Sequence, residues 1–136
     1  MKRPYQVALA IYMLFVLFML SADFDFGDGP NLPGLLEAAH FGLFGGMSVL
    51  IGIAFRRSQP DPGPALLYLA PLVAAAAYGL FLECVQLTLP HRSFDWNDAA
   101  YNLAGAALAQ AVLAAAYRSG RIPPADRVWL PRWGNL

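Results

Sequence analysis

The sequence predicts an all-α integral membrane protein, a bundle of four transmembrane helices. Hydrophobic residues make up 58% of its 136 residues and charged residues only 13%, against about 45–50% and about 25% in ordinary soluble proteins. The charges leave four uncharged runs of 18 to 21 residues, at 4–22, 38–55, 62–82 and 99–117. About 20 residues of helix cross a hydrocarbon core of about 30 Å, so each run is long enough to span it.

The uncharged runs should be helices rather than strands. A backbone segment in lipid must satisfy its own N–H and C=O groups, and transmembrane strands alternate polar and apolar residues, which these runs do not. The first run follows Lys2 and Arg3, as a signal sequence would, but its 19 residues exceed the usual apolar core of about 7–15. We therefore expect it to remain as the first span.

The basic residues predict the orientation of the chain, because short cytoplasmic loops of membrane proteins are enriched in Lys and Arg. Arg92 alone falls on one side of the predicted membrane. The opposite side carries eight basic residues: Lys2, Arg3, Arg56, Arg57, Arg118, Arg121, Arg127 and Arg132. Both termini are therefore predicted to be cytoplasmic, and the loops around residues 23–36 and 90–98 are predicted to lie outside.

The domain organisation is simple. Residues 1–120 form one predicted membrane domain, and residues 121–136 form a cytoplasmic tail that contains Pro and Trp. Gly42 and Gly46 have the spacing of small residues that let helices approach closely, within one chain or between copies, so homo-oligomerisation stays open. The single cysteine, Cys84, excludes an intramolecular disulfide, and nothing in the composition indicates nucleic-acid binding.

Glu83 is the first candidate functional residue. It lies at the end of an otherwise apolar run, where an ionisable side chain is costly unless it is paired or hydrated. Gln86 follows three residues later on the same helical face, which points both side chains into the bundle. A carboxyl group in such a place could donate or accept a proton; alternatively, Glu83 pairs with Arg92 and only holds the outer loop.

The fourth predicted helix begins with Asp98, just before the run 99–117, and contains Asn102, and both share a helical face with Gly105. Asp98 is close enough to the start of its helix to act as a cap or to interact with the helix dipole, a structural role as reasonable as a functional one. Asn102 lies about one turn deeper, where its amide needs partners. A hydrogen bond between helices is the simpler interpretation.

On the helix predicted around the run 38–55, Glu37 and His40 share a face with Phe44 and Met47, whereas the glycines lie opposite. The sequence alone leaves open which face meets the bundle interior. A Glu-x-x-His pair can bind a metal, but bundle di-metal sites use two such pairs with further carboxylates. Only one pair is present, so no metal and no cofactor are expected.

Arg92 is the one Lys or Arg residue of the predicted outer face, and its planar guanidinium suits a phosphate or a carboxylate.

The ordered series of residues from Glu83 to Gly105 resembles the signature of the VanZ-like family. His40-Phe41, which follows an acidic loop, resembles an earlier part of the pattern of that family. The resemblance covers most of residues 5–117, with Glu37 standing where that pattern suggests Asp or Lys. The signature positions are Glu83, Gln86, Pro90, Arg92, Asp95, Asp98, Asn102 and Gly105.

The VanZ-like family consists of small multi-span bacterial membrane proteins, so the resemblance implies a protein of the bacterial cytoplasmic membrane. The family is named for a member associated with reduced susceptibility to the glycopeptide teicoplanin. It implies site residues Glu83, Gln86, Arg92, Asp98 and Asn102, with His40 as a further candidate.

Three functions then stand as expectations. The first is binding of a lipid-linked envelope molecule or of the lipid tail of an antibiotic, with Arg92 holding the anionic group. The second is an intramembrane enzyme that modifies an envelope lipid, with Glu83 as acid or base and Asp98 or His40 as partner. The third is a scaffold without a ligand.

Overall fold

A computed structural model of the chain describes residues 4–22, 34–58, 63–90 and 93–121. Its elements are α1 (Pro4–Ser21), α2 (Leu35–Ser58), α3 (Pro64–Gln86) and α4 (Trp96–Arg118). No strand occurs in these four stretches, which confirms the predicted all-α fold. Three helices extend beyond the uncharged runs, so that Glu83, Gln86 and Asp98 lie within helices.

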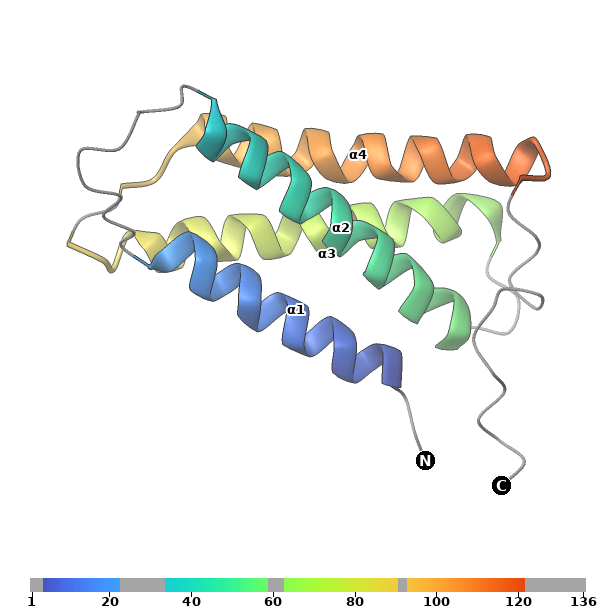
Figure 1. The fold of residues 1–136 in the computed structure, drawn as a ribbon, viewed down its shortest axis with the longest axis horizontal. Coiled ribbons are helices and arrows are strands. Elements are labelled where there is room, and N and C mark those ends of the chain that lie inside the picture. The colour runs from blue at the N-terminus through green and yellow to red at the C-terminus, as the bar shows by residue number, and fades with distance from the viewer. Residues whose placement is uncertain (1–3, 23–33, 59–62, 91–92, 122–136) are drawn as a thin grey trace.

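The four helices run alternately up and down along one long axis (Figure 1). α2 packs most extensively against α4, and α3 contacts both of them. α1 contacts α2 and α3 but, over the described residues, has no comparable contact with α4. The bundle is therefore a compact group of three helices, with α1 on its outside.

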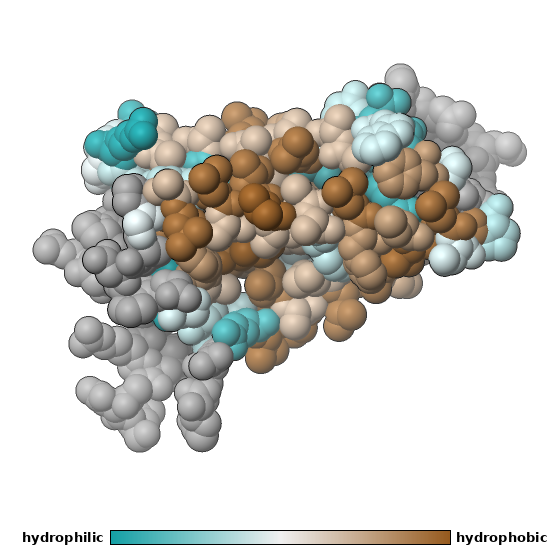
Figure 2. Space-filling view, turned by 180° about the vertical axis from the view of Figure 1, so that it is seen from behind, coloured by the Kyte–Doolittle hydropathy of each residue, from teal (hydrophilic) through white to brown (hydrophobic). Residues whose placement is uncertain are grey.

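The outer surface of the bundle is apolar. Large side chains such as Leu14 and Val73, 65% and 63% exposed, cover the outward faces of the helices. All four helices are long and apolar enough to cross a membrane. On the face seen in Figure 2, hydrophobic residues cover the middle of the bundle and hydrophilic ones gather at its ends. The chain is therefore a multi-pass membrane protein.

The interior, in contrast, holds several polar side chains. Six described polar residues are at most 5% exposed: His40, Ser48, Glu83, Gln86, Asn102 and Gln110. They accompany an apolar core that includes Phe44, Met47 and Leu82. Polar groups inside and apolar groups outside are expected when lipid rather than water surrounds the helices, because polar side chains then find partners only within the bundle.

Local sequence signals define the ends of α4. The Asp95 carboxylate accepts a hydrogen bond from the Asn97 N–H at 2.7 Å, so Asp95 is the N-cap. At the other end Gly120 has φ 70°, and the N–H groups of Gly120 and Arg121 bond to Tyr117 O and Ala116 O. This is a Schellman motif, which needs a residue that tolerates positive φ.

Arginines gather where α2 and α4 end. The Arg56 guanidinium lies 4.0 Å from the ring centre of Tyr117 and 5.5 Å from that of Tyr68, and Arg57 lies 5.8 Å from that of Tyr5. These cation–π contacts link α2 with the other three helices. One end of the bundle is thus basic, and the predicted cytoplasmic orientation of this end stays a prediction.

Glycines allow α2 and α4 to approach closely. A Cβ atom at Gly105 would overlap the main-chain carbonyl group of Phe41, and one at Gly45 would lie 3.3 Å from Gly105 O. Gly46 approaches α1 instead, because a Cβ there would lie 2.6 Å from the Tyr12 hydroxyl, whereas Gly42 has nothing within 4 Å. The crossing of α2 and α4 therefore depends on Gly45 and Gly105.

A buried hydrogen-bonded pair joins α2 and α4 near mid-membrane. Gln110 Nε2 donates to Ser48 Oγ at 2.7 Å and to Ser48 O at 3.0 Å. Replacing Gln110 by Leu removes both bonds, whereas Ser48→Ala keeps the bond to the main-chain oxygen and loses, besides the bond from Gln110, only a long contact of 3.4 Å from Ser48 Oγ to Ala106 O. We expect Gln110→Leu to lower the unfolding free energy by about 0.6–1.7 kcal/mol, and Ser48→Ala to lower it less, as measured by unfolding in mixed micelles. Equal losses would contradict the role of the main-chain bond.

Candidate functional site

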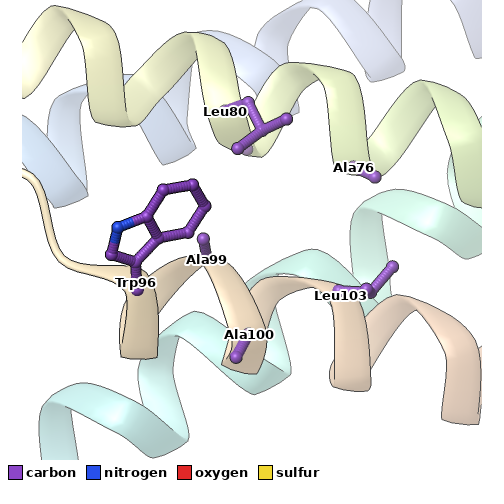
Figure 3. Close-up of a pocket in the computed structure, with 7 residues that line it drawn as sticks. Ala76, Leu80, Trp96, Ala99, Ala100 and Leu103 are labelled. Atoms are coloured by element: carbon purple, nitrogen blue, oxygen red, sulfur yellow. The ribbon is translucent and has the colours of Figure 1, made fainter.

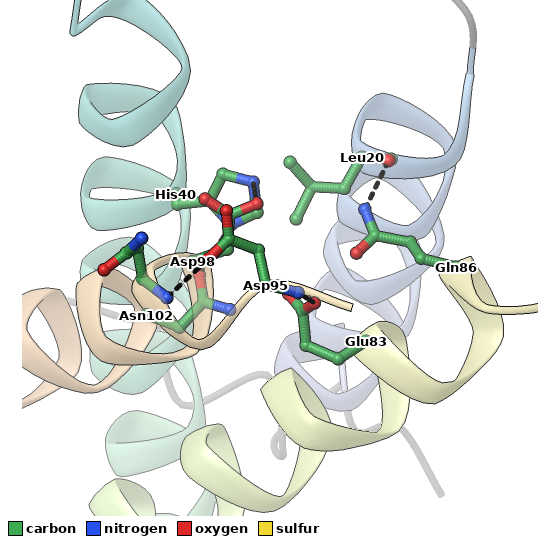
Figure 4. A network of polar contacts seen from close by, with 8 residues as sticks. Leu20, His40, Glu83, Gln86, Asp95, Asp98 and Asn102 are labelled. Carbon is green, nitrogen blue, oxygen red and sulfur yellow. Dashed lines mark hydrogen bonds and ion pairs between the residues drawn. The ribbon is translucent and has the colours of Figure 1, made fainter. Parts of the chain in front are cut away.

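A group of polar side chains lies where α1 and α3 end and α2 and α4 begin, and we call this the cluster end. His40 of α2, Glu83 of α3, and Asp98 and Asn102 of α4 point toward one another there (Figure 4). These four residues are called the polar cluster. Three of them, His40, Glu83 and Asn102, are at most 2% exposed, and the Asp98 side chain is 15% exposed. The cluster is therefore enclosed by the helices and reaches the surface through Asp98.

His40 lies at the centre of the polar cluster. Its Nδ1 is 3.0 Å from Asn102 Oδ1, and because that oxygen can only accept, Nδ1 carries the proton. Its Nε2 is 3.5 Å from Asp98 Oδ2 and has no hydrogen-bond partner among the described residues. The ring thus connects α2 to two positions one turn apart on α4.

Glu83 approaches the polar cluster from α3. Its Oε2 accepts a hydrogen bond from the main-chain N–H of Asp95 at 3.1 Å, which connects the end of α3 with the start of α4. Its other oxygen, Oε1, is buried and has no hydrogen-bond partner in the described part of the chain. The predicted partner Arg92 lies outside the described residues. One oxygen of Glu83 thus connects α3 with the start of α4, and the other can still accept a hydrogen bond or bind a ligand.

Asn102 connects the polar cluster to a closely packed glycine of α3. A Cβ atom at Gly79 would lie 3.3 Å from Asn102 Nδ2 and 3.1 Å from Phe44 Cε1. The Nδ2 atom is buried without a hydrogen-bond partner among the described residues. The bond to His40 is the interhelical role that the sequence favoured for Asn102, and its Nδ2 still lacks a partner.

The other predicted site residues lie apart from the polar cluster. Gln86 is buried, but its Nε2 donates to Leu20 O at 2.8 Å, so it fastens the end of α1 to α3. Glu37 is partly exposed on the first turn of α2. Cys84 is exposed toward the outside of the bundle. Gln86 therefore has a structural bond in addition to any role in binding.

The structure answers which face of α2 meets the interior. His40, Phe44, Met47 and Ser48 are all buried, so this face lines the core. The glycine face is used as well, since Gly45 meets α4 and Gly46 meets α1. A glycine-rich face can pack as closely as a face of large side chains, which is why the sequence pattern could not separate the two.

An apolar groove lies between α3 and α4 (Figure 3). Its volume is about 260 Å³. Its lining residues are Ala76, Gly79, Leu80, Trp96, Ala99, Ala100 and Leu103. Trp96 is 74% exposed and lies at the cluster end of the groove, where an indole ring suits the membrane–water interface. Gly79 belongs to the groove and also contacts Asn102, so the polar cluster lies directly behind it.

Sequence reasoning did not identify this groove or the pair of Ser48 and Gln110. The groove is lined by small and apolar side chains that look like any other part of a span. Gln110, in contrast, was a detectable signal, because an amide in the middle of an apolar run needs a partner. Asp95 was also missed as the donor to Glu83, since its contribution is a main-chain N–H that no side-chain pattern reveals.

Comparison with known proteins gives one family. A family model described as VanZ/LLP1 matches residues 5–117 of the chain, which includes all four helices except the first residue of α1 and the last of α4. No curated protein and no solved structure matches the chain.

Proposed function

Since the chain belongs to the VanZ/LLP1 family, we propose that it binds the acyl chain of a lipid-linked cell-envelope molecule or of a lipoglycopeptide at the cluster end of the bundle. The apolar groove between α3 and α4 carries this proposal. Its volume of about 260 Å³ is just below the range of about 300–1,000 Å³ for small-molecule sites. It therefore suits part of an acyl chain better than a whole head group.

The position of the groove supports a ligand with one apolar and one polar end. Its lining is apolar, and each CH₂ group buried there contributes about 0.8 kcal/mol relative to water. Trp96 marks the level at which a head group leaves the hydrocarbon region. Arg92 comes four residues before Trp96 in the sequence, outside the described residues, and as part of the proposal its guanidinium binds the anionic head group. The bacterial cytoplasmic membrane, with this end outward, is part of the proposal.

Acid–base chemistry on the bound lipid is the second candidate. The buried Glu83 Oε1 and His40 Nε2, without hydrogen-bond partners among the described residues, favour it, because a general acid or base needs an available atom. Both residues are at most 1% exposed, whereas the groove is open on the surface. Binding therefore agrees better with the geometry, and a scaffold without a ligand would leave the groove unused.

Drug susceptibility tests the proposal. Cells that express the wild type, Ala76→Phe, Ala77→Phe or Glu83→Gln at matched membrane levels are compared for growth in teicoplanin and in vancomycin. Ala76 lines the groove and Ala77 is an exposed neighbour outside it, so Ala77→Phe is a matched control. We expect the wild type and Ala77→Phe to protect against teicoplanin, and Ala76→Phe to lose most of that protection.

The Glu83→Gln result separates the three functions. Full protection would favour binding, lost protection at normal abundance would favour chemistry, and reduced abundance would favour a scaffold. If the wild type gives no protection, the lipids that copurify with the wild type and with Ala76→Phe are compared by mass spectrometry. The same lipids in equal amounts in both would contradict the groove as a binding site.

A further inference from the structure

The polar cluster brings together three side chains that commonly bind metals. One nitrogen of His40 and one oxygen each of Glu83 and Asp98 lie within 4.8 Å of one another. The three side chains come from three different helices and point into one shared space (Figure 4). His40 and Glu83 are at most 1% exposed, so these donors are not a chance group of surface acids.

The orientation of His40 is the one that a metal ligand needs. Because Nδ1 donates to Asn102 Oδ1 at 3.0 Å, Nε2 is the ring nitrogen that faces Asp98 and can offer a lone pair to a metal ion. Metal-binding histidines almost always donate their second ring nitrogen to an oxygen acceptor, which fixes the tautomer and the ring plane. Asn102 would be that acceptor here.

As in His40, one polar atom of Glu83 makes a hydrogen bond within the protein, and the other can bind a metal ion. Its Oε2 accepts from the Asp95 N–H, whereas its buried Oε1 has no hydrogen-bond partner among the described residues. Two carboxylates and an imidazole nitrogen thus converge in a largely buried site. Buried negative charges are strongly unfavourable unless cations or protons balance them.

We propose that His40, Glu83 and Asp98 bind a divalent transition-metal ion of the kind that accepts both imidazole and carboxylate ligands, such as Zn²⁺ or Mn²⁺. Bonds of about 2.0–2.2 Å place tetrahedral ligands about 3.4 Å apart. Ligand atoms already within 4.8 Å reach that spacing by small side-chain rotations. Three protein ligands leave a coordination position open.

This site differs from the metal pair that the sequence offered. Glu37 shares a helical turn with His40, but it is absent from the group of donors, whose carboxylates come from α3 and α4. The expectation of no metal depended on the single Glu-x-x-His pair, and sequence spacing cannot show that Glu83 and Asp98 converge on His40. The proposal is independent of the acyl-chain groove, because metal binding can be measured with the groove empty.

The test uses the full chain purified in detergent without a histidine tag and stripped of metal by a chelator. Zn²⁺ and, separately, Mn²⁺ are added, and the bound metal is measured by isothermal titration calorimetry and by elemental analysis after desalting. The substitutions are His40→Asn, Glu83→Gln and Asp98→Asn. Glu37→Gln, at the same end of α2, and Cys84→Ser, beside Glu83, are the matched controls.

We expect one metal ion per chain in the wild type and in both controls. Each ligand substitution should weaken binding by more than about 100-fold, since losing only an outer-shell partner costs about 10–100-fold. Asn102→Ala, which removes the acceptor for His40 Nδ1, should weaken it within that smaller range. Failure of the folded wild type to bind either metal stoichiometrically would overturn the proposal, as would unchanged binding in the three ligand variants.

X-ray absorption spectra of the metal-loaded wild type keep the proposal testable if the variants do not fold. One nitrogen with imidazole scattering and otherwise oxygen neighbours, at about 2.0–2.2 Å, would support it. A sulfur neighbour would assign the metal to Cys84 and would overturn it, as would a shell without imidazole. If protons alone balance the negative charge of the cluster, the folded wild type will bind neither metal stoichiometrically, and the proposal will be overturned.

Discussion

Gly105→Ala should be among the most destabilising single-methyl changes that this protein can receive. The added Cβ atom would overlap the carbonyl group of Phe41 in the main chain of α2. A flexible side chain could move away, but a helix backbone moves only if the whole crossing opens. Overpacking of this kind typically costs about 1–3 kcal/mol, and we expect the upper part of that range. Size-exclusion chromatography after heating in detergent measures the loss.

Gly42→Ala is the matched control for this change. It adds the same methyl group to a helix of the same bundle, but at a position with nothing within 4 Å. Alanine also has the higher helix propensity, by about 1 kcal/mol, so the control should be as stable as the wild type or more stable. Equal behaviour of the two variants would show that α2 and α4 do not cross closely at Gly105.

His40→Leu should cause the second large effect. Leucine approximately fills the space of the ring but removes the hydrogen bond to Asn102 Oδ1 and the contact with the Asp98 carboxyl group. Leaving a buried hydrogen-bonding group without its partner typically costs about 1–3 kcal/mol. In metal-free buffer we expect a loss of this order in the free energy of unfolding, despite the gain in apolar volume.

A double-mutant cycle shows whether this cost comes from His40 and Asp98 together. Adding Asp98→Asn to His40→Leu removes the carboxylate that faced the His40 ring, so the double variant should be more stable than the sum of the two single losses predicts. Coupling energies between contacting residues are about 0.5–3 kcal/mol. Additive losses would mean that the approach of 3.5 Å between Nε2 and Oδ2 carries no interaction.

The fold could be predicted well because it depends only on the length and the apolar character of the four runs. Four long apolar runs can cross a bilayer only as helices, so the runs alone predict the number of helices and their class. Which face of α2 lines the core depends on packing instead. Phe44 is buried completely, and Gly45 and Gly46 meet α4 and α1, so both faces make contacts that a hydrophobic pattern does not distinguish.

For the candidate site, the sequence predicted which residues are important but not which of them contact one another. Glu83, Asp98, Asn102 and His40 attract attention because polar side chains in an apolar span need partners. Which of them meet cannot be read from spacing, since Glu37 lies three residues from His40 in the sequence but Glu83 and Asp98 lie near its ring. The groove is less predictable still, because alanine, glycine and leucine at its surface differ in no obvious way from the same residues elsewhere in the spans.

The bonds that fasten α1 have a consequence for how freely its sequence can vary. Tyr78 donates to Met13 O and Gln86 to Leu20 O, while Tyr12 of α1 donates to Leu43 O. A carbonyl oxygen is present whatever side chain a residue carries, so positions 13, 20 and 43 can change without losing these bonds. His40 and Asn102 instead join side chain to side chain, so a change at either position needs a matching change at the other. As far as hydrogen bonding is concerned, substitutions should therefore be tolerated better at positions 13, 20 and 43 than at His40 and Asn102.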